Sequence, residues 1–469
     1  MAEQKRAPFH RPSATFNPLS NFREAPLEFT SWQEEQLSWK ESCYLHAGLN
    51  PPPSQRISGR DAARMLTTIC TNNVANVAVG GATHAVLVTS QGHVTASGMI
   101  FREAEDSFIA FIHKVLLDYH VAAGDWDITL EDLLGERFLF QIAGPRSLEV
   151  LEAALGEDLH DIRFFRHRHA PVARERLTVM GDLRIMRLGM AGSLAYEVHG
   201  DARDAEAVYE ALLKAGEPYG LRQLGSLVYI TSHHTENGFP NTYVHYPPAF
   251  AEDEAMVAHM RATGMLTDDY RPWPDLRGSM GPRLEDRFVT PFDLGWFHAV
   301  KFDHDFIGRE ALEPLAQAPP RKLVTLVWNP DDVAGLYRSL FEPGPKPQVM
   351  TLPGDDILKG PMLTLFNDQV RLDGERVGMS MGRMYSLYYG AMLSIAPVDV
   401  EHSAIGTELT VLWGDPGTPQ REIRVTVDRF PYLDVERNER VDVSAIPRLT
   451  GTRGDGSQAH GEEAVGTHG

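Results

Sequence analysis

Residues 187–239 read RLGMAGSLAYEVHGDARDAEAVYEALLKAGEPYGLRQLGSLVYITSHHTENGF, and the order of elements in this stretch decides the fold. A short strand carries Tyr196 and Glu197, and Asp201 stands where it can cap the helix that follows. Apolar residues recur through that helix at helical spacing, and Gly216 is the expected stop signal. We therefore predict a strand that leads directly into an amphipathic helix.

A second apolar run, Leu224 to Ile230, follows the helix and predicts another strand, which would bring Tyr229 back toward Glu197. A carboxylate and a phenol would then share one pocket, a layout suited to gripping and protonating a small molecule. The plain alternatives stay open at this point. A Glu at the end of a strand is more often a solvated edge residue, and a Tyr in an apolar run is more often part of the core.

The rest of the chain extends this pattern without the long run of parallel units that a doubly wound sheet needs. We predict an α+β fold with antiparallel sheets that carry helices on one face. After Arg321 the chain becomes mostly β, and Asp373-Gly374 is a type I′ turn signal, so a small closed antiparallel barrel is expected there. The predicted parts are an extended arm at 1–26, two interleaved α+β lobes at 27–310, the barrel at 311–447 and a disordered tail at 448–469.

Composition limits the functions that this chain of 469 residues can have. The formal net charge of −20 argues against a nucleic-acid partner, which needs a basic surface. No apolar run approaches the roughly 18 residues that cross a bilayer. Two cysteines in so long a chain, and an N-terminus without an apolar signal core, indicate a reducing cytoplasm.

Motifs for common cofactors are missing from the sequence. It has no phosphate-binding glycine loop, HExxH motif, paired CxxC motif or EF-hand loop. His233 and His234 are adjacent, so in a strand they would point to opposite faces and could not share one metal ion. We therefore expect no metal.

The most specific motif of the chain is TPFDLGWFHAVKFDHDFIGREAL at 290–312. It resembles the entry into the C-terminal domain of one known family, the glycine-cleavage T-protein (aminomethyltransferase) family. Further similar segments are GRDAARML at 59–66, FLFQIAGPRSLEVL at 138–151, GMAGSLAYEVHG at 189–200, RKLVTLVWN at 321–329 and the final barrel at 377–411. The resemblance covers roughly residues 30 to 430.

The resemblance implies a three-lobed ring with tetrahydrofolate in a central funnel. By position, Glu197 would hold the edge of the pterin, since a carboxylate can accept two parallel N–H bonds from an aminopyrimidine ring. Gln141 matches a family position near the same pocket, and Tyr196 beside Glu197 is expected among the cofactor-binding residues.

Two departures narrow the function that the resemblance implies. Ser97 replaces the family's catalytic aspartate, and Tyr229 replaces an arginine. Tyr229 in GSLVY instead resembles the catalytic tyrosine of the tetrahydrofolate-dependent aryl O-demethylases that act on vanillate, syringate and 3-O-methylgallate. This implies transfer of a methyl group from a lignin-derived methoxyarene to N5 of tetrahydrofolate, giving a phenol and 5-methyltetrahydrofolate. A phenol of pKa about 10 is a suitable acid for the departing aryl oxygen.

Other departures concern the methoxyarene. Pro51 and His113 align with the histidine and arginine that hold the substrate carboxylate in the vanillate enzymes, and Ser20 and Phe22 align with tyrosines of the N-terminal arm. A buried carboxylate would then be underpaired. We expect either a larger or uncharged methoxyarene, such as a lignin-derived dimer, or an anchor for the substrate acid elsewhere in the chain. The predicted substrate-binding residues are His113, Ser97, Phe239, Tyr243, His245 and Phe22, with Tyr246 as a further candidate for the changed pocket; for Phe239, Tyr243, His245 and Tyr246 a structural role is equally expected.

Two alternatives remain. One is another one-carbon transferase on this fold, opening methylenedioxy groups or demethylating amines or sulfoniums, and the other is a folate-binding protein without catalysis. The sequence does not indicate an oligomeric state.

Overall fold

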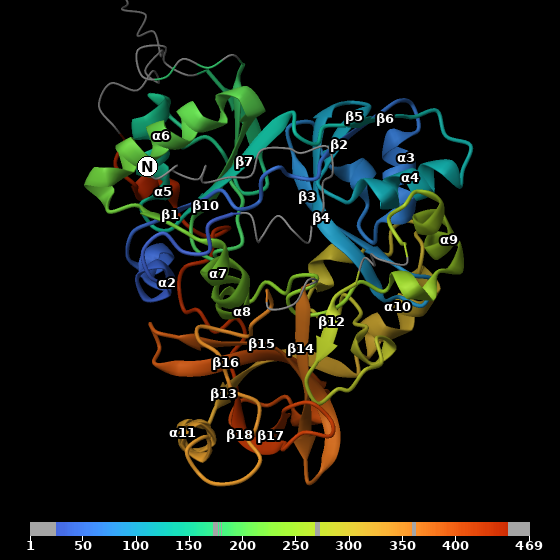
Figure 1. Ribbon diagram of the computed structural model, residues 1–469. Coiled ribbons are helices and arrows are strands. Elements are labelled where there is room, and N and C mark those ends of the chain that lie inside the picture. Colours follow the sequence, from blue (N-terminus) through green and yellow to red (C-terminus); the bar gives the residue numbers. More distant parts are fainter. Residues whose placement is uncertain are drawn as a thin grey trace, which may run out of the picture.

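The computed structural model describes residues 25–171, 177, 179, 181–267, 273–358 and 363–448. Three bodies surround a common centre, with two α/β lobes side by side and a barrel below them (Figure 1). The predicted α+β class with antiparallel sheets and a C-terminal barrel is confirmed. Most of the predicted arm at 1–26, with Ser20 and Phe22, and all but the first residue of the predicted tail at 448–469 lie outside the described residues.

The first lobe is a six-stranded sheet with two helices on one face. Its strand order is β11-β1-β7-β10-β9-β8, and its elements are β1 (Tyr44–His46), β7 (Arg137–Ala143), β8 (His167–Ala170), β9 (Leu183–Met186), β10 (Ala195–Asp201), β11 (Arg222–Gln223), α5 (Ser147–Leu155) and α6 (Ala205–Gly216). The Asp201 carboxylate accepts a hydrogen bond from the Arg203 N–H, and α6 ends at Gly216, as predicted. Val208 and Leu212 of α6 pack in the core beneath the sheet.

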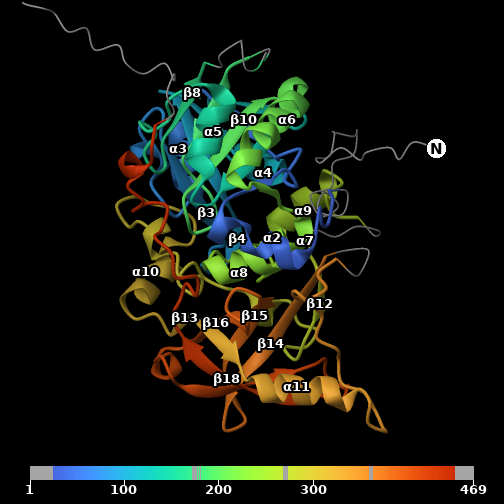
Figure 2. The ribbon, with the colours of Figure 1, turned by 90° about the vertical axis from the view of Figure 1, so that its left-hand side faces the viewer.

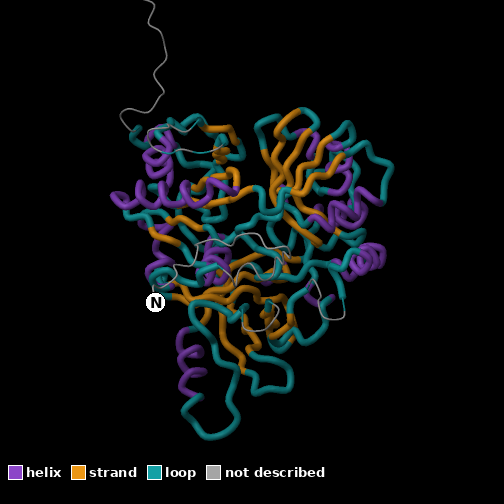
Figure 3. The backbone as a smooth tube through the Cα atoms, turned by 45° about the horizontal axis from the view of Figure 1, so that its top comes forward, coloured by secondary structure: helices purple, strands orange, loops and turns teal. Residues whose placement is uncertain are grey.

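The second lobe is a five-stranded sheet of order β3-β4-β5-β2-β6, again covered on one side by helices. Its elements are β2 (Gln55–Ser58), β3 (Ala82–Val88), β4 (Val94–Ala104), β5 (Ser107–Ala110), β6 (Thr129–Asp132), α3 (Ala62–Ile69), α4 (Lys114–Ala122) and α9 (Glu254–Ala262). The helices of both lobes lie mainly on their outer sides (Figure 3), which leaves the other sheet faces directed toward the middle of the molecule.

The barrel closes because β14 pairs with both β15 and β17. Its strands are β13 (Arg321–Trp328), β14 (Thr364–Leu372), β15 (Glu375–Ser386), β16 (Ala391–Asp399), β17 (Glu408–Trp413) and β18 (Arg421–Asp428), with α10 (Arg309–Gln317) before it and α11 (Pro330–Ser339) on its side. β12 (Asp275–Arg277) adds a parallel pairing to β14. The predicted type I′ turn is confirmed, since Asp373 and Gly374 have φ values of 51° and 85°.

The chain returns to the first lobe after the barrel. Val441, Val443 and Ile446 pack against the first-lobe core. The Arg187 guanidinium donates to the carbonyls of Asn438 and Val441 from within the lobe. We call residues 433–446 the C-terminal return segment.

The buried carboxyl of Asp368, in β14, is expected to make the stability of the fold depend on pH. Burial raises the pKa of this carboxyl to about 7, and its Oδ1 accepts from the Ser279 N–H at 2.8 Å. The folded protein then holds a proton between pH ~4 and ~7 that the unfolded chain releases, so stability falls as pH rises through that window. We expect Asp368→Asn to be more stable than wild type at pH 8 by a few kcal/mol and closer to it at pH 4, in urea unfolding across pH. Asp373→Asn, at an exposed turn, is the control, and equal pH slopes for wild type and Asp368→Asn would contradict the assignment.

Candidate functional site

A row of polar side chains crosses the inward face of the first-lobe sheet. Glu197 of β10 lies opposite Gln141 of β7, which in turn lies opposite His46 of β1. The Gln141 amide donates to Glu197 Oε1 at 3.0 Å, and the His199 ring donates to Glu197 Oε2 at 3.1 Å. Each carboxylate oxygen keeps further acceptor capacity. This row is an acceptor-rich surface on a rigid strand scaffold.

Tyr196 does not share that face. It lies opposite Ile142 in the strand register, and its ring packs in the helix-covered core of the first lobe. Successive residues of a strand point to opposite sides of the sheet, so Glu197 and Tyr196 cannot contact one small ligand together. The structure therefore does not bring Tyr196 together with the other predicted cofactor-binding residues, Glu197 and Gln141.

Tyr229 lies on a helix rather than on the predicted strand. The chain runs from α7 (Ser226–Val228) through a π-helical turn (Tyr229–His233) into α8 (His234–Asn237), which Gly238 ends at φ 72°. A short continuous apolar run cannot separate a strand from a buried helix by periodicity, and here the segment is buried on all sides. Wide π-turns occur often at functional positions. Because His233 and His234 lie in this helical segment, their side chains do not point to opposite faces of a strand as expected. Their buried rings lie 5.5 Å apart.

The Tyr229 ring is enclosed by aromatic and histidine rings. Its side chain is 1% exposed and stacks on His46, with centroids 3.8 Å apart and planes 9° apart. His233 and His234 lie at 5.2 and 5.0 Å. Burial raises the pKa of Tyr229 well above its usual value, with smaller contributions from Tyr44 and Glu197. The phenol therefore stays neutral and keeps its proton at physiological pH.

Several buried polar atoms of this cluster have no hydrogen-bond partner among the described residues: His46 Nε2, Gln141 Oε1 and Tyr229 Oη. Gln141 is close enough to lower the pKa of the Tyr229 hydroxyl slightly, but no hydrogen bond of ordinary geometry joins them. A buried polar group without a partner costs about 1–3 kcal/mol. Together these donors and acceptors fit the polar edge of a heterocyclic ligand.

His46 is fixed in one tautomer. Its Nδ1 donates to the Leu224 carbonyl at 2.9 Å, so Nε2 carries a lone pair. Burial lowers the pKa of His46 to about 4 and keeps the ring neutral. His46 was not among the residues predicted from the sequence. The available signal was the alternation of Tyr44 and His46 in a short strand, but only the sheet register places His46 next to Gln141.

The predicted substrate-binding residues are placed unequally. Phe239 lies 6.4 Å from the His234 ring, which touches Tyr229. Tyr243 packs against the apolar cluster that contains Tyr229. Ser97 of β4 lies next to Tyr246 and influences its hydroxyl. These residues are therefore brought toward one region.

His245 and His113 fit the prediction less well. The two ring nitrogens of His245 are engaged by Thr235 Oγ1 and the Asn241 N–H, both at 3.0 Å, so this ring holds a loop in place. His113 is the N-cap residue of α4 in the second lobe, and burial lowers its pKa to about 4. Among the described residues, no hydrogen bond joins His113 to Tyr229 or Glu197. Pro51, which is buried after β1, and His113 were aligned with residues that hold a substrate carboxylate. Neither provides a cation for that purpose.

Helix α2 (Trp32–Glu41) holds the Tyr229 helix between the first lobe and the barrel (Figures 1 and 2). The Gln36 amide donates to Ser232 Oγ at 2.8 Å, and the Trp39 indole donates to Asn237 Oδ1 at 3.2 Å. Lys40 forms an ion pair with Glu236, and both side chains are almost fully buried, at 1% and 0% exposure. Ser386 of the barrel also donates to Glu236. One carboxylate thus connects three parts of the chain.

Removing one partner of this buried pair is expected to destabilise the protein strongly. Glu236→Gln leaves the Lys40 ammonium buried without a counter-charge, and we expect a loss of about 3–5 kcal/mol in urea unfolding. The double variant Lys40→Met, Glu236→Gln should recover much of that loss because no charge remains buried. The prediction would be contradicted if the double variant lost as much unfolding free energy as the single variants Lys40→Met and Glu236→Gln lose together.

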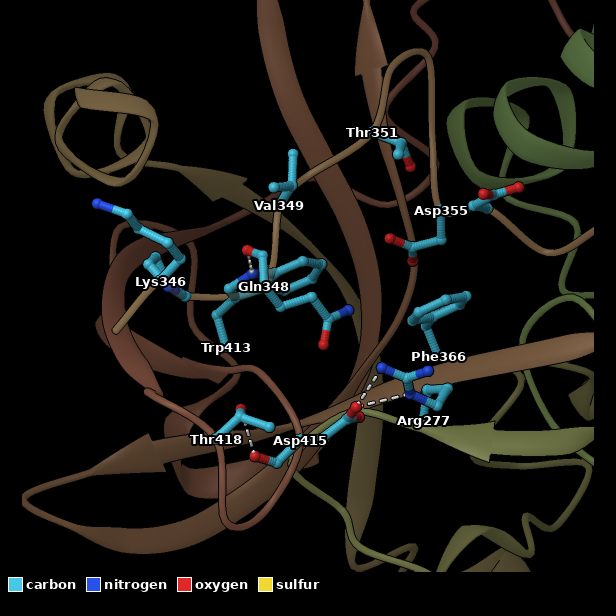
Figure 4. Close-up of a pocket in the computed structure, with 12 residues that line it drawn as sticks. Arg277, Lys346, Gln348, Val349, Thr351, Asp355, Phe366, Trp413, Asp415 and Thr418 are labelled. Carbon is cyan, nitrogen blue, oxygen red and sulfur yellow. Dashed lines mark hydrogen bonds and ion pairs between the residues drawn. The ribbon is translucent and has the colours of Figure 1, made fainter. Parts of the chain in front are cut away.

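A concavity of about 330 Å³ opens elsewhere, in the barrel (Figure 4). The lining charges are largely paired: Arg277 donates to Asp415, and Asp355 accepts from Arg383. None of the predicted site residues lines it. The Tyr229 region is therefore the candidate site.

Glu152, Asp158 and His160 form a further cluster of groups that bind metals in other proteins. His160 Nδ1 contacts both carboxylates, and its Nε2 contacts the Ile446 carbonyl at 3.1 Å. Since both ring nitrogens are engaged, this cluster acts as an attachment point for the C-terminal return segment.

No helix in the described part of the chain has both the length and the apolar character needed to cross a bilayer.

Comparison with known proteins gives consistent matches. Residues 15–244 match the GCVT N-terminal domain. The chain is 44% identical to sesamin methylene transferase of Sinomonas sp. (strain No.22), over 92% of this chain and 96% of that protein. It is 31% identical to syringate O-demethylase of Sphingobium sp. (strain NBRC 103272 / SYK-6), over 89% and 92%. The crystal structure of the glycine cleavage aminomethyltransferase T from Bartonella henselae shares the fold, with a TM-score of 0.60 at 17% identity over 87% and 90% of the two chains.

Proposed function

Because this chain belongs to the GCVT family of transferases, we propose that it moves one carbon from an aryl ether to tetrahydrofolate. The first candidate reaction takes the methyl group of a lignin-derived methoxyarene to N5 and gives a phenol and 5-methyltetrahydrofolate. The name of the syringate relative supports this reaction class.

The observation that carries the proposal is a neutral phenol buried beside a carboxylate. Tyr229 keeps its proton because its pKa lies well above the usual value, and Glu197 lies near enough to contribute to that shift. The chemistry needs these two properties together. An acid must protonate the departing oxygen, and an acceptor must hold the N–H edge of the folate.

Tyr229 has the proton-donor role in this mechanism. The C–O bond of the ether breaks, its electrons pass to the aryl oxygen, and Tyr229 delivers a proton to that oxygen. The methyl carbon forms its new bond to N5, and the proton that N5 loses restores the tyrosine. General acid help of this kind contributes ~10²–10⁴-fold, and alignment of the reacting atoms contributes more.

Glu197 and Gln141 are the residues that would hold tetrahydrofolate. Glu197 keeps acceptor capacity on both oxygens, and Gln141 has an unpartnered buried carbonyl oxygen. A pterin edge presents several N–H donors, which fits this set.

Methylene transfer is a second candidate. The 44% identity to a sesamin methylene transferase favours it. Opening a methylenedioxy ring would give a catechol and 5,10-methylenetetrahydrofolate. Both carbon–oxygen bonds break, the carbon bonds to N5 and N10, and the two protons that these nitrogens lose pass to the catechol oxygens.

Product analysis separates the candidates. Wild-type protein is incubated with tetrahydrofolate and a panel of ¹³C-labelled methoxyarenes and methylenedioxyarenes, and the labelled folate is identified by NMR. We expect labelled 5-methyltetrahydrofolate from a methoxyarene, while 5,10-methylenetetrahydrofolate would support the second candidate. Tight folate binding without turnover of any compound would contradict both and indicate a non-catalytic protein.

The cytoplasm is the proposed location. Cys43 and Cys70 are both free and buried, which suits a reducing compartment.

A further inference from the structure

His84 of β3 is a buried histidine whose polar atoms are unused. Its side chain is 5% exposed, and neither ring nitrogen has a hydrogen-bond partner among the described residues. The ring is surrounded by other rings: Trp296 at 4.8 Å, Phe239 at 5.4 Å and His298 at 6.1 Å. Two unpartnered nitrogens in an aromatic enclosure are costly, at about 1–3 kcal/mol each.

The His84 ring is uncharged. Burial, with a smaller contribution from His298, lowers the pKa of His84 to about 3. Burial also lowers the pKa of His298. A neutral imidazole offers one N–H donor and one nitrogen acceptor. A hydroxyl group can bond at either nitrogen, because it both donates and accepts, whereas a carboxylate can only accept from the N–H.

His84 is connected to the reacting region by ring contacts. Phe239 touches His84 on one side and His234 on the other, and His234 touches Tyr229. In the β3–β4 register, His84 lies opposite Met99 and Val86 lies opposite Ser97, so His84 and Ser97 occupy the same face of the hairpin. His84 therefore belongs to the wall that Ser97 and Phe239 were expected to form.

We propose that His84 binds an uncharged oxygen substituent of the aromatic substrate, remote from the bond that breaks, and so selects neutral aryl ethers over aryl carboxylates. This inference rests on the proposed function and deepens it. His84 is a specificity-determining residue, while Tyr229 performs the chemistry. The neutral His84 ring, surrounded by other rings, can form a hydrogen bond with a hydroxyl group. It offers no counter-charge to a buried anion.

Three matched ethers test the proposal. They share one methoxyphenyl group and carry hydroxymethyl, methyl or carboxylate as the remote substituent. Each is made with one ring and with two linked rings, because the rings of His234 and Phe239 lie between Tyr229 and His84. The same substituents on a methylenedioxyphenyl group cover the second candidate reaction.

Wild-type protein is expected to favour the hydroxymethyl compound over the methyl compound by ~5-fold in kcat/KM, since one net hydrogen bond is worth about 1 kcal/mol. His84→Leu should remove that preference through KM with kcat nearly unchanged, and His84→Gln, which keeps a donor and an acceptor, should restore part of it. Calorimetric binding of the same compounds gives a readout without turnover.

The outcomes separate this inference from the proposed function. If the wild-type protein turns over no ether, the proposed function fails and this inference fails with it. If wild type is active but His84→Leu weakens all three compounds equally, only the assignment of His84 is overturned. Urea unfolding of His84→Leu adds an independent check: we expect no loss of stability, because two unpartnered nitrogens leave the core.

Discussion

Tyr229→Phe is expected to lose ~10²–10⁴-fold in turnover while tetrahydrofolate affinity and folding stability stay close to wild type. The ring keeps its stack on His46, since only the hydroxyl is removed. That hydroxyl makes no hydrogen bond within the described residues, so its loss leaves no other group unpaired. Single-turnover rates, folate titration by calorimetry and urea unfolding measure the three quantities.

Tyr196→Phe is the matched control. Tyr196 also has a buried hydroxyl without a hydrogen-bond partner among the described residues, but it lies in the core on the opposite face of the same sheet. The control should keep wild-type turnover. Equal losses in both variants, or a Tyr229→Phe protein with more than a tenth of normal activity, would remove the tyrosine from the proposed mechanism.

Glu197→Gln is expected to weaken tetrahydrofolate binding about 10- to 100-fold. Hydrogen bonds to a charged group contribute about 1.5–3 kcal/mol, and the amide keeps the shape but not the charge. The substitution also replaces one acceptor oxygen by a donor, which would oppose an N–H edge. Calorimetric titration with tetrahydrofolate in the absence of any ether measures the effect directly.

Glu210→Gln, on the exposed side of α6, is the control for the loss of one negative charge. It should bind tetrahydrofolate as the wild type does. Unchanged affinity in Glu197→Gln would show that the polar row on the sheet serves the fold alone.

Local sequence signals predicted those parts of the structure that depend on neighbouring residues. Asp201 acts through a side-chain cap and the Asp373-Gly374 turn through positive φ values, and both predictions are confirmed. Helix α6 also ends at Gly216, although this residue keeps a helical φ of −80° and the left-handed residue follows later, at Gly220. The family resemblance, inferred from segments such as residues 138–151 and 189–200, is confirmed by the matching domain and relatives.

The site was predictable only in part, because its geometry depends on distant contacts. Glu197 and Gln141 meet because two strands far apart in sequence pair in one register. The helix around Tyr229 has the same local composition as a strand, and its conformation depends on contacts with Gln36, Lys40 and the barrel. His46 and His84 carry no motif, and only their unpartnered nitrogens draw attention to them.

The C-terminal return segment has a practical consequence for anyone who wishes to divide this protein. Residues that follow the barrel pack against the apolar core of the first lobe, through Val441, Val443 and Ile446. A fragment that stops where the barrel begins would expose the apolar surface that the return segment covers, and it should aggregate. Complete folding of the first lobe must therefore await residues 441–446, and split versions should regain solubility only when both pieces are made together.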